Sequence, residues 1–282
     1  MRNNSHFQSI LKIISKLAYS RNTWEIFYDF MELSAICISN TIDRRHFDER
    51  EQQYLTTIQK YNPEHQKLFP EMFALLILAL EHEWETAGFT DVLGCLFHEL
   101  ELHNKYKGQF FTPQHICTMM GKMVFTENDK AILEQGYISV LEPACGSGAM
   151  ILGFAQAVID SGYNHSQQIL VSAVDIDIKC VYMCYIQLSL YGIPAVVKHG
   201  NSLTTEEWSH WYTPAYVVGG WRWKRQRKVE NPENSMTHEP QDGEVDAGAA
   251  VPASTEADVI MPTKEAVESY IQLDLFNFNE GE

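Results

Sequence analysis

Residues 137–159 read YISVLEPACGSGAMILGFAQAVI, an apolar run that ends at Glu142 and passes through a glycine-containing turn into a second apolar run. The spacing predicts a strand, a tight turn and a helix. In such a unit Gly146 and Gly148 let the backbone approach a ligand closely, and the amino-terminal amides of the helix face that ligand. The stretch therefore predicts a small polar ligand at the carboxyl end of the strand.

A second predicted strand, QILVSAVDID, places another carboxylate near this turn. It ends at Asp175, whose carboxylate could accept hydrogen bonds from both hydroxyls of a ribose, so we expect a ligand that contains a nucleoside. Glu142 would repel a pyrophosphate but could accept hydrogen bonds from an ammonium group, which favours S-adenosylmethionine. A dinucleotide fingerprint requires a third glycine where this chain has Ile151, and no Gly-Lys-Ser/Thr follows the turn to make a P-loop.

The acidity of the chain is concentrated in one segment. The formal charge is −16 over 282 residues, and residues 229–282 hold 13 Asp and Glu against one Lys, which is −12 and leaves −4 on residues 1–228. The preceding WRWKRQRK (221–228) carries cations that could pair with phosphates and tryptophans that could stack on bases. It could equally be a solvated helix end or a linker. The candidate DNA-binding residues are Arg222, Lys224, Arg225, Arg227 and Lys228.

Four regions follow from the pattern of the chain. Apolar residues at three- and four-residue spacing predict a helical subdomain over residues 1–103, and apolar runs that alternate with helices predict an α/β domain over 104–228. Residues 229–265 are predicted to be a disordered acidic linker before an apolar peptide at 266–282. The chain has neither a long apolar span nor an export signal, and its six cysteines show no ligand spacing. We therefore expect a cytoplasmic protein with no membrane association and no metal site.

Four motifs, in this order along the chain, carry a family resemblance: GQFFTP (108–113), LEPACGSGAM (141–150), VDID (174–177) and GNSL (200–203). Together they resemble the N6-adenine DNA methyltransferases related to the modification subunits of type I restriction systems. The resemblance covers about residues 91–220. It implies a Rossmann-like, S-adenosylmethionine-dependent methyltransferase fold with an amino-terminal helical part.

The resemblance also implies roles for individual residues at a cofactor site. It implies that the methionine part of S-adenosylmethionine is capped by Phe111, Thr112 and Pro113. It implies a loop beneath the cofactor made of Glu142, Ala144, Gly146 and Gly148. It implies that Asp175 holds the ribose, that Ile176 lies beside the adenine and that Asn201 lies near its exocyclic amine.

The catalytic motif of the family is present only in a degenerate form. These enzymes carry Asn or Asp, then Pro-Pro, then an aromatic residue after the fourth strand, which hold the amine of the target adenine and stack on the flipped-out base. The corresponding candidate here is TPAY, with catalytic residues Thr213, Pro214 and Tyr216 and with Ala215 in place of the second proline. No apolar strand precedes it, only TTEEWSHWY.

The predicted sheet is smaller than that of the complete family fold. We expect strands at 137–141, 169–174, 194–198 and 215–218, after which the chain becomes basic and then acidic. The part that recognises the target sequence is then missing or supplied by another polypeptide, such as a separate specificity subunit.

The segment QLDLF near the end of the chain resembles the peptide with which bacterial polymerases and repair proteins bind the sliding clamp. A glutamine amide would enter a polar pocket and a Leu-Phe pair an apolar one, so the predicted contacts are Gln272, Leu273, Leu275 and Phe276. The alternative is an amphipathic turn that packs on its own domain.

The sequence as a whole predicts an adenine-N6 DNA methyltransferase tethered to the clamp. The alternative is an S-adenosylmethionine-binding module that binds DNA or a partner without catalysis. A nicotinamide-dependent oxidoreductase is disfavoured by Ile151 and Glu142.

Overall fold

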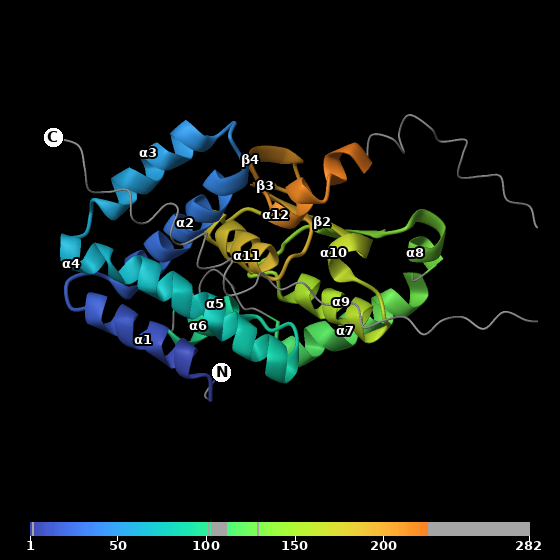
Figure 1. The fold of residues 1–282 in the computed structure, drawn as a ribbon, viewed down its shortest axis with the longest axis horizontal. Coiled ribbons are helices and arrows are strands. Elements are labelled where there is room, and N and C mark those ends of the chain that lie inside the picture. The colour runs from blue at the N-terminus through green and yellow to red at the C-terminus, as the bar shows by residue number, and fades with distance from the viewer. Residues whose placement is uncertain (2, 101, 103–111, 129, 225–282) are drawn as a thin grey trace, which may run out of the picture. The chain divides into compact units, whose positions relative to one another are not determined.

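The computed structural model describes residues 1, 3–100, 102, 112–128 and 130–224 (Figure 1). Met1–Trp221 form one compact unit, and residues 222–224 are the described part of a second unit. Several predictions lie outside the described residues: the linker 229–265, the peptide 266–282 with Gln272, Leu273, Leu275 and Phe276, the cofactor residue Phe111, and the cations Arg225, Arg227 and Lys228.

The amino-terminal part is helical, as predicted. Its helices are α1 (Ser5–Leu17), α2 (Thr23–Ile42), α3 (Phe47–Ile58), α4 (Pro63–Gln66), α5 (Leu68–Ala87) and α6 (Val92–Glu99). The side chains of Asn4, Asn22, Asn62 and Asp91 each accept a backbone N–H in the first turn of a helix. These caps satisfy donors that a helix start leaves without an intrahelical partner.

Within the described residues, no helix is long and apolar enough to cross a membrane.

The following part is a mixed sheet with four strands in the described chain, in the order β1-β2-β3-β4. Parallel strands β1 (Ile138–Glu142), β2 (Ile169–Asp175) and β3 (Ala195–Asn201) are followed by antiparallel β4 (Glu206–Tyr212). The helices of this part are α7 (Gln114–Asn128), α8 (Lys130–Gln135), α9 (Ala149–Asp160), α10 (His165–Gln168), α11 (Ile178–Leu190) and α12 (Pro214–Val218). This is the α/β methyltransferase-like fold that the sequence predicts.

The fourth strand differs from the prediction. Residues 215–218 lie in helix α12, whereas 206–212, which we expected to be too polar for a strand, form β4. Among the described strands β4 lies at the edge of the sheet, so only part of its surface needs to be apolar. Trp211 is buried on one face, while Lys198 on β3 forms an ion pair with Glu207 that faces solvent.

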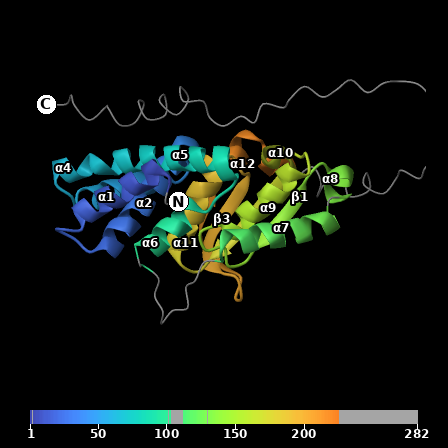
Figure 2. The same ribbon diagram turned by 90° about the horizontal axis from the view of Figure 1, so that it is seen from below.

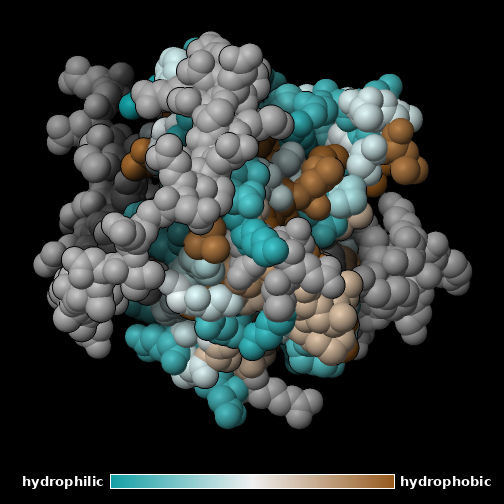
Figure 3. All heavy atoms as spheres, turned by 90° about the vertical axis from the view of Figure 1, so that its right-hand side faces the viewer, coloured by the Kyte–Doolittle hydropathy of each residue, from teal (hydrophilic) through white to brown (hydrophobic). Residues whose placement is uncertain are grey.

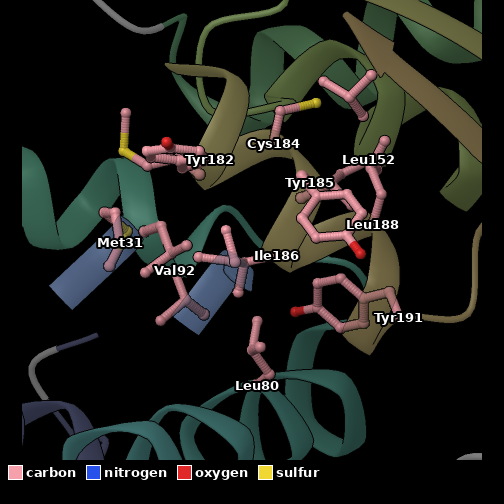
Figure 4. Packing of buried hydrophobic residues seen from close by; sticks show 14 of the residues in the cluster. Met31, Leu80, Val92, Leu152, Tyr182, Cys184, Tyr185, Ile186, Leu188 and Tyr191 are labelled. Carbon is pink, nitrogen blue, oxygen red and sulfur yellow. The ribbon is translucent and has the colours of Figure 1, made fainter. Parts of the chain in front are cut away.

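The helical part and the sheet share one hydrophobic core. Ile169, Val171 and Ala173 of β2 belong to the same cluster of buried residues as the helices of the amino-terminal part. Figure 4 shows side chains of α11 among those of α2, α5, α6 and α9; the labelled residues are Tyr182, Cys184, Tyr185, Ile186, Leu188, Tyr191, Met31, Leu80, Val92 and Leu152. The predicted boundary at residue 103 therefore does not separate two independent cores.

Helix α7 lies along α9 (Figure 2), and two glycines make their close contact possible. A Cβ on Gly153 would lie 2.4 Å from the carbonyl carbon and oxygen of Cys117, and a Cβ on Gly121 would lie 2.5 Å from the carbonyl oxygen of Gly153. Neither position has room for a side chain. The packing fixes α9, the helix that follows the glycine loop, against α7.

One edge of the sheet is open among the described residues. There β1 pairs only with β2, and Leu141 at its carboxyl end is 71% exposed. Other exposed apolar residues on nearby elements are Met119, Met120, Met123 and Val124 of α7 and Leu133 of α8. On the side of the molecule where α8 lies, hydrophobic residues form separate groups among hydrophilic ones (Figure 3).

Candidate functional site

The loop of residues 143–148 joins β1 to α9 at the carboxyl edge of the sheet. The Cys145 N–H donates to the carbonyl oxygen of Val174 at 2.9 Å, which ties the loop to β2. Gly146 and Gly148 have φ angles of 54° and 96°, in the left-handed region that glycine adopts without strain. A Cβ on Gly148 would also lie 3.2 Å from the Cys184 sulfur, so this loop needs glycine for both conformation and space.

Asp175 ends β2 directly beside this loop. One carboxylate oxygen, Oδ2, accepts the N–H of Gly146 at 2.9 Å, and Oδ1 accepts the N–H of Asp177 at 2.9 Å. An ionised carboxylate has about four lone-pair sites, so both oxygens keep accepting capacity for a ligand. Burial raises the pKa of Asp175, partly offset by these backbone hydrogen bonds.

Glu142 ends β1 and lies on the same edge. Its Oε1 accepts the N–H of Ala144 at 3.2 Å. Burial raises the pKa of Glu142, and the negative charge of Asp175 raises it further. Glu142 and Asp175 are half-buried and repel each other when both are ionised. A cationic ligand would stabilise the ionised form of both carboxylates.

Asp91, which sequence reasoning did not single out, connects the helical part to the loop. Its Oδ1 accepts the Gly94 N–H at 2.8 Å and the Gln187 Nε2–H at 2.9 Å, and its Oδ2 accepts the Ser147 hydroxyl at 2.6 Å. Gln187 Nε2 also donates to the Ser147 carbonyl oxygen at 2.7 Å. Asp91, Gly94, Ser147 and Gln187 are all buried. Burial raises the pKa of Asp91.

Asp91 also brings the predicted residues Thr112 and Pro113 close to the loop. The backbone N–H of Asp91 donates to Gln114 Oε1 at 3.2 Å, and Gln114 is the first residue of α7, directly after Pro113. Thr112 and Pro113 are exposed. Asp91 thus links the glycine loop, through its carboxylate, to the start of α7, through its backbone N–H. The only sequence signal for Asp91 is its position as a helix cap in TDVLG.

The remaining predicted cofactor residues lie at the same edge. Ile176 follows Asp175 and is 62% exposed. Asn201 ends β3, and its Oδ1 accepts the N–H of Leu203 at 3.0 Å, which shapes the β3–β4 turn. Glu142, Asp175 and Asn201 are therefore the last residues of three neighbouring parallel strands.

The TPAY motif lies at the amino-terminal end of β3, opposite the carboxyl ends of the strands, so the structure does not bring the predicted catalytic residues Thr213, Pro214 and Tyr216 beside the glycine loop. β4 is antiparallel, so the residues after it meet the start of β3: the Thr213 N–H donates to the Ala195 carbonyl oxygen at 3.0 Å. The length of β3 separates this point from the glycine loop, which is about 20 Å at about 3.3 Å per residue.

The local contacts of TPAY are those of a helix start. The Thr213 hydroxyl donates to the Ile193 carbonyl oxygen at 2.8 Å and accepts the Ala195 N–H at 2.8 Å, and the residue is fully buried. Pro214 is the first residue of α12, where a missing N–H costs nothing. Tyr216 is buried and stacks on Tyr212, with ring centroids 5.4 Å apart.

The basic segment begins with a tryptophan that is buried rather than available for stacking on bases. Trp221 packs edge-on against Tyr137, with ring centroids 5.1 Å apart, and is 1% exposed. In the second unit, Arg222, Trp223 and Lys224 are exposed.

Comparisons with solved structures found matches of low similarity, among them the following two. A structure from Listeria monocytogenes assigned to the class I S-adenosylmethionine-dependent methyltransferases is 16% identical, with a TM-score of 0.39, over 71% of this chain and 55% of that chain. The methyltransferase subunit of a type I restriction-modification system from Streptococcus thermophilus is 12% identical, with a TM-score of 0.33, over 73% of this chain and 60% of that chain. The chain thus spans less than two thirds of the length of either structure.

A comparison with curated proteins found no significant match. The family model for N-6 DNA methylases matches residues 88–259, which is more than half of the chain. The matched range includes Asp91, the glycine loop, Asp175 and Asn201. On this match the chain belongs to the N-6 DNA methylase family, whose members are S-adenosylmethionine-dependent methyltransferases.

Proposed function

We propose that the protein binds S-adenosylmethionine at the glycine loop and transfers its methyl group to N6 of adenine in DNA. The observation that carries the proposal is the pair of half-buried carboxylates, Glu142 and Asp175, on either side of a glycine loop at the carboxyl edge of a parallel sheet. A phosphate ligand would be repelled by this pair, whereas a ligand with a sulfonium, an ammonium and a ribose suits it.

In this proposal each element of the edge holds one part of the methyl donor. Asp175 accepts hydrogen bonds from the ribose hydroxyls and Glu142 from the ammonium group. The loop residues Ala144, Gly146 and Gly148 lie beneath the donor, while Phe111, Thr112 and Pro113 cap its methionine part. Ile176 lies beside the adenine and Asn201 near the exocyclic amine. The hydrogen bond from the Gly146 N–H to Asp175 fixes the position of the loop relative to this carboxylate.

The bound donor supplies an electrophilic methyl group on sulfur. In the transfer, the lone pair of the target N6 would form a bond to the methyl carbon while the electron pair of the carbon–sulfur bond stays on sulfur, which leaves S-adenosylhomocysteine, and the proton released from N6 would pass to water. The chain's contribution at the glycine loop is to hold the donor so that this methyl carbon faces the incoming amine. Thr213, Pro214 and Tyr216 are the residues predicted to hold that amine. Thr213 and Tyr216 are buried, and the motif begins at the end of β3 opposite the glycine loop, which argues against this role.

A second candidate function is an S-adenosylmethionine-binding module that binds DNA or a partner protein without transferring the methyl group. The position of TPAY favours it, because the residues expected to orient the target amine stabilise a helix start instead. Both candidates share the cofactor site and differ only in the chemical step.

The proposed partners are DNA, a separate specificity subunit and the bacterial sliding clamp. The cations Arg222, Lys224, Arg225, Arg227 and Lys228 would pair with phosphates. The peptide residues Gln272, Leu273, Leu275 and Phe276 would bind the clamp. Retention of the full chain on immobilised clamp tests the last point: we expect the double substitution Leu275→Ala and Phe276→Ala to abolish it, and unchanged retention removes the clamp from the proposal.

Calorimetry with S-adenosylhomocysteine tests the cofactor site. We expect the wild-type chain to bind, Asp175→Ala to bind at least about tenfold more weakly, which is about 1.4 kcal/mol, and Asp160→Ala to bind like the wild type. Asp160 is a matched control because its carboxylate lies on α9 in a pair with Lys122. Binding of a dinucleotide in place of S-adenosylhomocysteine would contradict the proposal.

Incorporation of label from tritiated S-adenosylmethionine into unmethylated DNA separates the two candidate functions. Label in N6-methyladenine, lost in Asp175→Ala, supports the methyltransferase. Cofactor binding without incorporation, with and without the clamp, supports the non-catalytic module.

A further inference from the structure

The hairpin of β3 and β4 contains a β-bulge at the carboxyl edge of the sheet. His199 pairs with Ser209 and Gly200 pairs with Glu207, so Trp208 is the extra residue on β4. A bulge redirects a side chain and is common next to binding sites. Here the Trp208 ring lies against the His199 ring, with centroids 4.7 Å apart and planes at 73°.

His199 connects this indole to the loop after β2. It is the register partner of Asp175 in the parallel ladder, and its Nε2 lies 3.3 Å from the carbonyl oxygen of Ile176, within reach of a hydrogen bond. The Trp208 side chain is 52% exposed and Ile176 is also largely exposed. We call Ile176, His199 and Trp208 the Trp208 wall. It stands beside the carboxylate that would hold a ribose.

We propose that the Trp208 wall stacks on an adenine base. An indole face that remains open to solvent offers the π-surface on which a base stacks, and each base held in this way contributes substantially to affinity. His199 packs against the indole in an edge-to-face arrangement, and Trp208 is nevertheless 52% exposed, so much of its surface remains accessible to a base. The resemblance to the family assigns Ile176 but neither His199 nor Trp208, because both depend on a hairpin that the sequence did not predict.

The proposal rests on the proposed function, because Asp175 defines where the nucleoside lies. The adenine belongs either to the methyl donor or to the DNA, and both present the same ring. Two probes distinguish these sources: S-adenosylhomocysteine, and a single-stranded oligonucleotide that contains adenine.

The experiment measures the dissociation constants of both probes for the wild-type full chain, Trp208→Ala, Trp208→Phe and Tyr19→Ala. Tyr19 is a matched control because it is an exposed aromatic residue that follows α1. We expect Trp208→Ala to weaken binding of one probe about 5- to 10-fold, Trp208→Phe to weaken it less than about threefold, and Tyr19→Ala to change nothing. The lower end of the measured range for base stacking, about 1 kcal/mol, corresponds to about fivefold. We expect the circular dichroism spectrum of Trp208→Phe to match that of the wild type, which checks that the fold is retained.

Each outcome decides between the possibilities. A loss confined to S-adenosylhomocysteine assigns the wall to the methyl donor, and a loss confined to the oligonucleotide assigns it to a DNA base. If the wild type binds both probes and Trp208→Ala binds both equally well, the wall is not a base platform and the proposed function stands. If the wild type binds neither probe, both proposals are wrong.

Discussion

The hydrogen bonds of Asp91 lead to a sharp prediction about what holds the glycine loop. Replacing Asp91 by Ala removes an acceptor from three buried donors: the Gly94 N–H, the Gln187 Nε2–H and the Ser147 hydroxyl. A buried donor left without a partner costs about 1 to 3 kcal/mol, so three of them at the lower limit cost about 3 kcal/mol. For a unit of this size that loss lowers the melting temperature by about 6 to 12 °C.

Asp91→Asn is the matched control, because its atoms can keep all three bonds. The side-chain carbonyl oxygen of Asn would replace Oδ1, which accepts from Gly94 and Gln187. Its NH2 group would replace Oδ2 and donate to the Ser147 hydroxyl, which can accept as well as donate. We expect a melting temperature within about 3 °C of the wild type, since this change is worth less than about 1 kcal/mol.

The pH dependence adds a second measurement on the same pair. Burial raises the pKa of Asp91 in the folded state, so its contribution to stability is full at acid pH and declines as the pH rises through that raised pKa. We expect the wild type to lose stability in this way as the pH rises and Asp91→Asn not to do so.

Differential scanning calorimetry measures the stability, and titration with S-adenosylhomocysteine measures the effect on the loop. We expect Asp91→Ala to bind more weakly than Asp91→Asn, because Ser147 loses its anchor. Equal destabilisation by Ala and Asn would refute the hydrogen-bond account and leave only the charge. An unchanged melting temperature for Asp91→Ala would show that the network does not form.

Three other predictions concern the helix contact, the second carboxylate and the TPAY motif. Gly153→Ala places a Cβ 2.4 Å from the backbone of Cys117. We expect the free energy of unfolding, measured in urea, to fall by about 1 to 3 kcal/mol, as at other overpacked sites. A change below about 0.5 kcal/mol would contradict the close contact. The affinity for S-adenosylmethionine should fall as the pH drops through the raised pKa of Glu142, because protonation removes a charge that attracts the ammonium group. Calorimetry should show that the affinity of Glu142→Gln depends less on pH. The same pH dependence in both proteins would exclude Glu142 as the ammonium-binding residue. Thr213→Ala should lower the free energy of unfolding by about 1 to 3 kcal/mol, because it leaves a buried N–H without its acceptor, and should leave the affinity for S-adenosylhomocysteine unchanged. A loss of affinity with unchanged stability would instead place Thr213 at the cofactor site.

The parallel strands could be predicted closely because each contains a short apolar run between polar or glycine-rich segments. Those expected at 137–141, 169–174 and 194–198 lie at 138–142, 169–175 and 195–201. β4 could not be predicted in the same way, since an edge strand can be polar and its pairing depends on a hairpin turn. In TPAY, the residues that predict a catalytic motif also form a helix start, with Thr213 as the cap and Pro214 as the first residue of α12.

Some residues of the site can be recognised from short stretches of sequence, and others depend on contacts between distant parts of the chain. Glu142, the glycines and Asp175 are recognisable because chemistry and spacing coincide within short stretches. Asp91 is not, because its bond to Ser147 joins residues 56 positions apart, and tertiary packing brings the start of α6 to the loop before α9.

By itself the sequence determined the strand–turn–helix unit, the carboxylates at its edge and membership of a methyltransferase class, because these depend on periodicity and on residues close together in the chain. Tertiary structure alone decided which distant residues share the edge of the sheet. The antiparallel course of β4 carried Thr213 away from the glycine loop and brought Trp208 towards it. The physical reason is that strand direction and bulge position are set by pairing between strands, which no short stretch of sequence specifies.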